Sequence, residues 1–166
     1  MLFFPQDYKL VRATKDLQAQ YQVNLRDAVK RIGHGRTTYS HELERVGQGL
    51  FKQGWQGVVP RDMIPPAKQN SYLICNLDRS GKQKLFHWVC RYVDSDGEIA
   101  WHDPLGTAGI AQAQPLRRQL RGKQWTDDDN IRDPSHQGNS QDNCGQRCLA
   151  ALMIGQQSGM DDFLLL

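Results

Sequence analysis

Hydrophobic residues in the first third of the chain recur every three or four positions, which is the spacing of one face of a helix. This pattern predicts helices over residues 10–21 and 24–32. Asn24 is placed to cap the second helix, and Gly33 lies just past its end. The pattern returns over residues 40–52. We therefore expect three helices before the chain changes character.

The middle of the chain consists of short apolar runs bounded by turn residues, which is typical of strands. The runs predict strands over residues 71–77, 84–93 and 98–102. The last two strands are joined by Asp-Ser-Asp-Gly, a sequence that favours a hairpin. The hairpin makes neighbouring strands antiparallel.

The last third begins with a weakly helical stretch over residues 108–121, in which Pro115 should break or start a helix. A polar, loop-like segment follows over residues 125–140, and an apolar helix pattern begins at Cys144. The order of helices, strands and a final helix predicts an α+β fold. We expect a central, mostly antiparallel sheet flanked by helices.

Length and composition set the class of protein. The chain has 166 residues, which suits one domain spanning residues 1–166. Hydrophobic residues make up 39% of it, and no apolar run is long enough to cross a membrane, so no membrane partner is expected. The first residues lack the basic flank and long apolar stretch of a signal peptide, so we expect a protein that is not secreted.

Charge is concentrated at the N-terminus. Residues 1–36 hold seven Lys or Arg and three acidic residues, whereas the remainder is close to neutral. The sequence thus predicts a basic N-terminal helical extension over residues 1–36. Such an extension can bind nucleic acid or an acidic partner, or it can be a solvated helix face.

Four cysteines are the candidates for nucleophilic or metal chemistry: Cys75, Cys90, Cys144 and Cys148. They form no CxxC pair and no disulfide framework, so neither a zinc site nor structural disulfides are expected. Cys144 follows a polar loop and starts a helix, where the helix dipole and unpaired N–H groups favour the thiolate. Cys144 is therefore the candidate nucleophile, and the other three are expected to be small buried residues.

A cysteine nucleophile needs a base, usually a histidine that a third group orients. If residues 95–97 form a three-residue loop, Asp103 falls opposite Val89, on the same strand face as His87 and one diagonal step away. This register makes His87 and Asp103 a plausible base and orienting acid. A register shift of odd parity would separate them.

Two other histidines stay open as candidates for the base. His102 neighbours Asp103 in sequence but points to the opposite strand face. His136 lies in the loop before Cys144 and is near it in sequence. Any of these histidines can also be a structural residue.

Four blocks of sequence occur in the order and spacing of a known family: residues 57–60 with the strand that follows them, 86–88, 101–106 and 137–148. In these blocks the chain resembles the adenain family, the maturation proteases of adenoviruses. It is similar, more distantly, to the ubiquitin-like-protein proteases of the same clan. The resemblance spans roughly residues 40–157.

The resemblance implies a papain-like or adenain-like fold with the nucleophile at the N-terminus of a core helix. It assigns Cys144 as nucleophile, His87 as general base and then acid, and Asp103 as the group that orients the imidazole. It assigns the side-chain amide of Gln137 to the oxyanion hole, beside the backbone N–H of Cys144. Trp88 would shield the site or pack beside it, and Gly145 would keep the oxyanion pocket clear or simply suit a helix start.

The resemblance also implies a function. The expected activity is that of a cysteine endopeptidase that cleaves viral precursor and structural proteins during virion maturation, after Gly in small-residue contexts. The expected location is the virion and the infected host cell. The alternative is a protease of ubiquitin or SUMO-like modifiers from a pathogen. A non-catalytic binding protein on this fold and an acyltransferase with the same residues are the further alternatives.

The resemblance implies no metal and no cofactor for the chemistry itself. Family members are activated by a short peptide, which a disulfide can hold, and by DNA. The loop over residues 123–135 contains no cysteine, so a disulfide-held peptide is not expected here. DNA would bind through residues 1–36, and those helices can instead bind a partner or inhibit the enzyme. We expect polypeptide substrates and a monomer.

Overall fold

The computed structural model describes residues 5–78, 80–81, 87–104, 110–127 and 143–166. The elements in chain order are α1 (Pro5–Ile32), α2 (Ser40–Phe51), the short 3-10 helix η1 (Lys52–Gly54), β1 (Trp55–Pro60), β2 (Ser71–Asn76), β3 (Trp88–Val93), β4 (Ile99–His102), α3 (Ile110–Gln119), β5 (Gln124–Thr126), α4 (Cys144–Ser158) and α5 (Met160–Phe163). The fold is α+β, as the order of patterns predicts.

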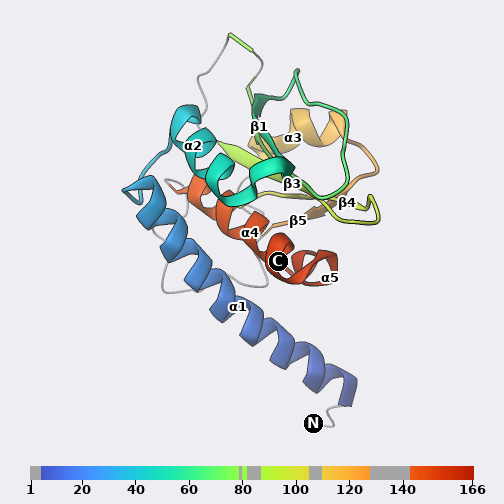
Figure 1. Cartoon of the computed structure of the whole chain (residues 1–166). Helices are drawn as coiled ribbons and strands as arrows, with labels where there is room; N and C mark the ends of the chain where they lie inside the picture. The colour runs from blue at the N-terminus through green and yellow to red at the C-terminus, as the bar shows by residue number, and fades with distance from the viewer. Residues whose placement is uncertain (1–4, 79, 82–86, 105–109, 128–142) are drawn as a thin grey trace.

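The five strands form one sheet in the order β1-β2-β3-β4-β5 (Figure 1). The two inner pairings, β2 with β3 and β3 with β4, are antiparallel, and the two outer pairings are parallel. The sheet is therefore mixed rather than mostly antiparallel. The difference arises because β1 and β5 join its edges, whereas the sequence patterns predict only the three central strands.

The hairpin between β3 and β4 has the predicted register. Cys90 pairs with His102, and Val93 pairs with Ile99. The turn closes with a hydrogen bond from the Asp94 N–H to the Glu98 carbonyl, 3.0 Å between N and O. Gly97 adopts a positive φ of 81°, which a residue with a side chain rarely adopts. The predicted three-residue loop is confirmed, and it fixes which residues share a face beyond the last pair.

The N-terminal region forms one continuous helix, α1, rather than the two predicted helices (Figure 1). Asn24 lies inside this helix and caps nothing. Its side-chain amide donates to Gln157 Oε1 at 3.0 Å, and more weakly to the carbonyl of Ala150 at 3.4 Å. These partners on α4 satisfy a polar group that would otherwise favour a helix start.

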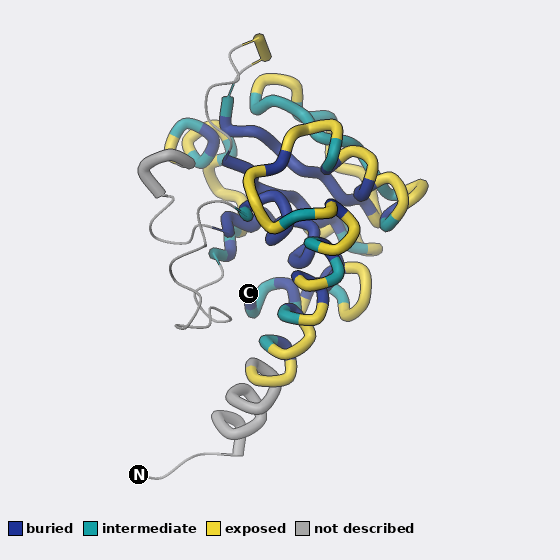
Figure 2. Tube along the Cα trace, turned by 90° about the vertical axis from the view of Figure 1, so that its left-hand side faces the viewer, coloured by how far each residue is buried: buried dark blue, intermediate teal, exposed yellow. Residues whose placement is uncertain are grey.

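Helices cover both faces of the sheet. One apolar cluster joins α1, α2, α4 and α5 to one face, and a second joins α3 to the other through Leu116. Figure 2 shows the resulting burial along the sheet strands and α4, with the exposed positions on the outer sides of the helices. Tyr21 and Ala28 of α1 are fully buried in the first cluster. The C-terminal half of the basic extension is thus part of the core.

The helix α4 is buried along most of its length. Every residue from Cys144 to Gly155 is buried, and α4 lies between the sheet and α1 (Figure 1). Other boundaries differ from the predictions by small amounts. Pro115 lies inside α3 and neither breaks nor starts it. The strands β1 and β5 and the helix α5 were not predicted from the sequence patterns. Among the described residues, no helix combines the length and apolar character needed to span a membrane.

Candidate active site

Three segments that are distant in sequence meet at the end of the sheet where β3 begins and β4 finishes. His87 directly precedes β3, Asp103 directly follows β4, and Cys144 is the first residue of α4. Because β3 and β4 are antiparallel, the start of β3 and the end of β4 lie at the same end of the sheet strands. The register therefore places His87 and Asp103 together.

His87 and Asp103 form a buried hydrogen-bonded pair. His87 Nε2 lies 2.8 Å from Asp103 Oδ1, and the two side chains are 4% and 0% exposed. The backbone also holds both residues. The His87 carbonyl accepts from Leu77 N at 3.3 Å, and the Asp103 N–H donates to the Thr126 carbonyl at 2.9 Å. The contact predicted from the hairpin register is confirmed.

Cys144 interacts with the same imidazole and makes up the third member of the site. Burial alone would lower the pKa of His87. The hydrogen bond with Asp103, together with the negative charges of Asp103 and Cys144, outweighs burial and raises the pKa of His87 to about 9. The imidazole is therefore protonated at neutral pH when these two groups are charged.

The ring geometry assigns a task to each nitrogen. Nε2 is held by Asp103, and the buried Nδ1 makes no hydrogen bond to a described residue, so Nδ1 is the nitrogen left to exchange a proton with Cys144. A charged imidazole beside a thiol at a helix N-terminus stabilises the thiolate. The arrangement can form a thiolate–imidazolium pair, the reactive state of a cysteine nucleophile.

The segment between α1 and α2 fixes the first turn of α4. The Gln146 side-chain amide, fully buried, donates to the carbonyls of His34 at 3.0 Å and Arg36 at 2.8 Å. A Cβ on Gly145 would overlap the hydroxyl of Thr38 and press against Leu43. Gly145 is thus required by close packing at its Cα. This reason differs from both sequence explanations for Gly145.

The remaining histidines lie elsewhere. His102 points to the opposite sheet face, where Nδ1 is 2.6 Å from Thr126 Oγ1 and the ring edge meets Phe163. His34 pairs with Glu42 at 2.7 Å. His136 and Gln137 lie outside the described residues, so a base at His136 and an oxyanion donor at Gln137 stay predictions. The alternative of His102 as the base finds no support in this geometry.

The other three cysteines are buried free thiols. Burial raises the pKa of Cys75 to about 12 and the pKa of Cys148 well above its ordinary range. Both are therefore protonated at neutral pH, as expected of structural cysteines. No cluster of three or more His, Cys, Asp or Glu that could hold a metal occurs within the described part of the chain.

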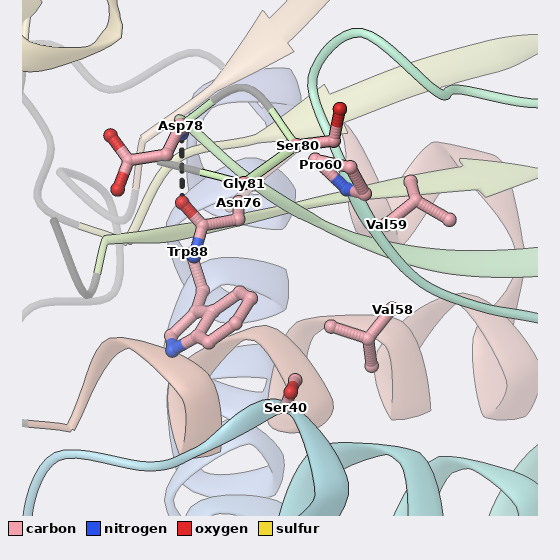
Figure 3. A pocket seen from close by; sticks show the side chains of 9 residues that line it. All are labelled: Ser40, Val58, Val59, Pro60, Asn76, Asp78, Ser80, Gly81 and Trp88. Carbon is pink, nitrogen blue, oxygen red and sulfur yellow. Dashed lines mark hydrogen bonds between the residues drawn. The ribbon is translucent and has the colours of Figure 1, made fainter. Parts of the chain in front are cut away.

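A hollow opens beside the site, with about 560 Å³ of empty space including the part that opens to solvent (Figure 3). Its lining consists of Ser40, Val58, Val59, Pro60, Asn76, Asp78, Ser80, Gly81 and Trp88. Trp88, next to His87 in sequence, is buried and packs beside the site with its Nε1 donating to the Thr38 carbonyl at 3.4 Å.

One polar group in the wall of this hollow makes no hydrogen bond within the described part of the chain. Asn76 is 5% exposed, and its Oδ1 accepts from Asp78 N at 2.8 Å. Its Nδ2 is buried without a hydrogen bond to any described residue. A buried N–H group without a hydrogen bond is costly, so this amide is a strained feature of the wall of the hollow. No pattern in the sequence marks Asn76, because only the fold places it beside Trp88.

Searches against protein-family models, curated proteins and solved structures find no match to this chain. The candidate site therefore rests on the motifs of the sequence and on the geometry of His87, Asp103 and Cys144.

Proposed function

We propose that this protein is a cysteine endopeptidase. The observation that carries the proposal is the 2.8 Å contact between His87 Nε2 and Asp103 Oδ1, with Cys144 of the α4 N-terminus interacting with the same ring. A nucleophile, a base and an orienting acid from three segments meet the requirements of acyl transfer.

In the proposed reaction the Cys144 thiolate attacks the carbonyl carbon of the scissile peptide bond. The protonated His87 then gives its proton to the leaving amine, and a thioester to Cys144 forms as the C–N bond breaks. His87, now neutral, takes a proton from water, whose oxygen attacks the thioester and releases the acid. Asp103 keeps the ring oriented through both steps and stabilises its charged form.

Charge on the carbonyl oxygen develops next to the first turn of α4. Backbone N–H groups at a helix N-terminus have no partner within the helix, and the Cys144 N–H is one of these groups. It would donate to the developing oxyanion. The resemblance to adenain adds the Gln137 amide as the second donor.

The proposed substrate is an extended polypeptide. The hollow beside Trp88 has an apolar wall from Val58, Val59 and Pro60, and Asn76 lines it as well. The four sequence blocks shared with the adenain family support viral precursor and structural proteins as the natural substrates. They also support cleavage after Gly in small-residue contexts, during virion maturation.

Substrate profiling with the purified chain tests this function. We expect cleavage of peptides after Gly, with complete loss of cleavage in Cys144→Ala. Profiling with and without added DNA measures whether nucleic acid activates the enzyme. Absence of cleavage across a diverse library, by an enzyme that is folded and reduced, would contradict the proposal.

A modifier protease uses the same chemistry on a different substrate. Ubiquitin and SUMO carrying a C-terminal vinyl electrophile distinguish the two. We expect no labelling of Cys144 by either probe at concentrations that label known modifier proteases. Rapid, Cys144-dependent labelling would replace the viral precursor proposal with the modifier protease.

A further inference from the structure

The buried carboxylate of Asp103 faces two cations. Its Oδ1 contacts His87, and its Oδ2 lies 3.7 Å from Nη2 of Arg117. Asp103 is 0% exposed, whereas the Arg117 side chain is 25% exposed. A fully buried carboxylate is costly unless cations or hydrogen bonds satisfy both of its oxygens.

Arg117 is held in place independently of Asp103. Its guanidinium lies over the ring of Trp125, 4.9 Å from the centroid, and Trp125 stacks on Trp101 of β4 at 5.6 Å. The preceding residue, Leu116, is fully buried and anchors α3 to this face of the sheet. A planar guanidinium stacked on an indole has fewer accessible orientations than an exposed arginine.

We propose that Arg117 is a positioning residue that holds the Asp103 carboxylate with Oδ1 toward the His87 ring. The proposal rests on the proposed function, because it gives Arg117 a role in the same site. Its contact with the site is the one with Asp103, so its proposed effect on His87 passes through that carboxylate.

The charged groups around Asp103 determine what removal of Arg117 does to it. Asp103 is approached by His87 from the start of β3 and Arg117 from α3, while Cys144 and Cys148 of α4 interact with this cluster as well. Without Arg117, Oδ2 of the fully buried carboxylate loses the cation beside it, so the carboxylate either turns away from His87 or takes up a proton. Both changes weaken the support that Asp103 gives to the charged imidazole.

The direction in which the pKa of His87 changes when Arg117 is removed separates a positioning role from a simple charge effect. If Arg117 positions Asp103, its removal lowers the pKa of His87 toward the ordinary value of about 6.5. If Arg117 is only a nearby positive charge, its removal raises the pKa of His87, because one repelling cation is gone. NMR titration of the His87 ring in Arg117→Gln measures this sign directly.

We expect the His87 titration midpoint to fall by at least about one pH unit in Arg117→Gln. We expect kcat to fall roughly 10- to 100-fold with KM nearly unchanged. Arg117→Lys keeps the charge without the planar stacking and should recover part of both losses. The matched control is Arg118→Gln, an exposed neighbour on the same helix, which should behave as wild type.

An unchanged or higher His87 midpoint in Arg117→Gln, or a kcat equal to wild type, would overturn the proposal. If Arg117→Gln fails to fold by circular dichroism, Arg117→Lys carries the test, with a lower midpoint as the expected result. The titration needs no substrate. If the chain cleaves no peptide, the endopeptidase function fails while the link from Arg117 to His87 is still measured.

Discussion

Cys144 and Cys148 lie one turn apart on the same buried helix, and their surroundings differ in kind. Cys144 is 3% exposed and Cys148 is 0% exposed, so burial does not distinguish them. Cys144 interacts with the His87 ring, whereas Cys148 contacts Cys90 and donates to the Trp88 carbonyl at 3.4 Å.

The comparison shows what makes a buried thiol reactive. Burial and the contact with Cys90 raise the pKa of Cys148 and keep it protonated. Cys144 is the first residue of α4, where the helix dipole favours a negative charge, and it interacts electrostatically with the His87 imidazole. One turn of helix separates the candidate nucleophile, Cys144, from the core residue Cys148. Of the two thiols, Cys144 is the one that raises the pKa of His87.

The largest expected effect comes from removing each thiol in turn. Cys144→Ala should lower peptide cleavage by roughly 10⁴-fold or more, because it removes the nucleophile. Cys148→Ala should keep cleavage within about threefold and lose about 1 kcal/mol of stability, because it removes only a buried sulfur. Steady-state cleavage and urea unfolding measure both. Equal losses in the two variants would end the distinction between the thiols.

The charge on His87 gives the next largest effect, and its sign is fixed. The pKa of His87 in the folded protein is about 9, above its value of about 6.5 in the unfolded chain. The contribution of charged His87 to the free energy of unfolding is therefore complete below pH 6.5 and is lost as the pH rises through 9. The span is about 3 kcal/mol at most.

Urea unfolding of wild type and His87→Gln at pH 6, 8 and 10 measures this stabilisation as a difference between the two proteins. We expect the excess in free energy of unfolding of wild type over His87→Gln to shrink steadily from pH 6 to pH 10. An advantage that stays constant, or grows with pH, would show that His87 is neutral in the folded protein.

A smaller effect follows from the first turn of α4. Gly145→Ala should destabilise the protein by about 1–3 kcal/mol, because the new Cβ overlaps Thr38 and presses on Leu43. Gly49→Ala is the matched control. Gly49 lies in α2 with open space around its Cα, so Gly49→Ala should stabilise the protein by about 0.5–1 kcal/mol.

Thermal unfolding compares the two glycine variants, and iodoacetamide reactivity reports whether the turn has moved Cys144. The double variant Thr38→Ala with Gly145→Ala should recover part of the loss, because the overlapping hydroxyl is gone. A Gly145→Ala protein as stable as Gly49→Ala would contradict the packing that positions Cys144.

Local signals in the sequence predict much of the site. The Asp-Ser-Asp-Gly turn sets the register of β3 and β4, and this register places Asp103 against His87. The change from a polar loop to an apolar pattern predicts the start of α4 at Cys144. Each of these inferences depends on residues that are close in sequence or on a hairpin of short reach.

Long-range contacts account for what the sequence does not predict. Asn24 reads as a helix cap, but its partner Gln157 on α4 allows α1 to continue through it. The three-residue strand β5 exists because it pairs with β4. The link between Arg117 and Asp103 joins α3 to the end of a strand. No local pattern encodes these partners, because each depends on how separate elements pack.

The rate of alkylation of Cys144 by iodoacetamide, measured across pH, tests the central claim most directly. If His87 holds a thiolate at Cys144, the rate in wild type is nearly constant from pH 6 to pH 8. In His87→Gln the rate should rise close to tenfold per pH unit over the same range, as for an ordinary thiol. A tenfold rise per unit in wild type, with His87→Gln giving the same profile, would contradict a nucleophile activated by His87.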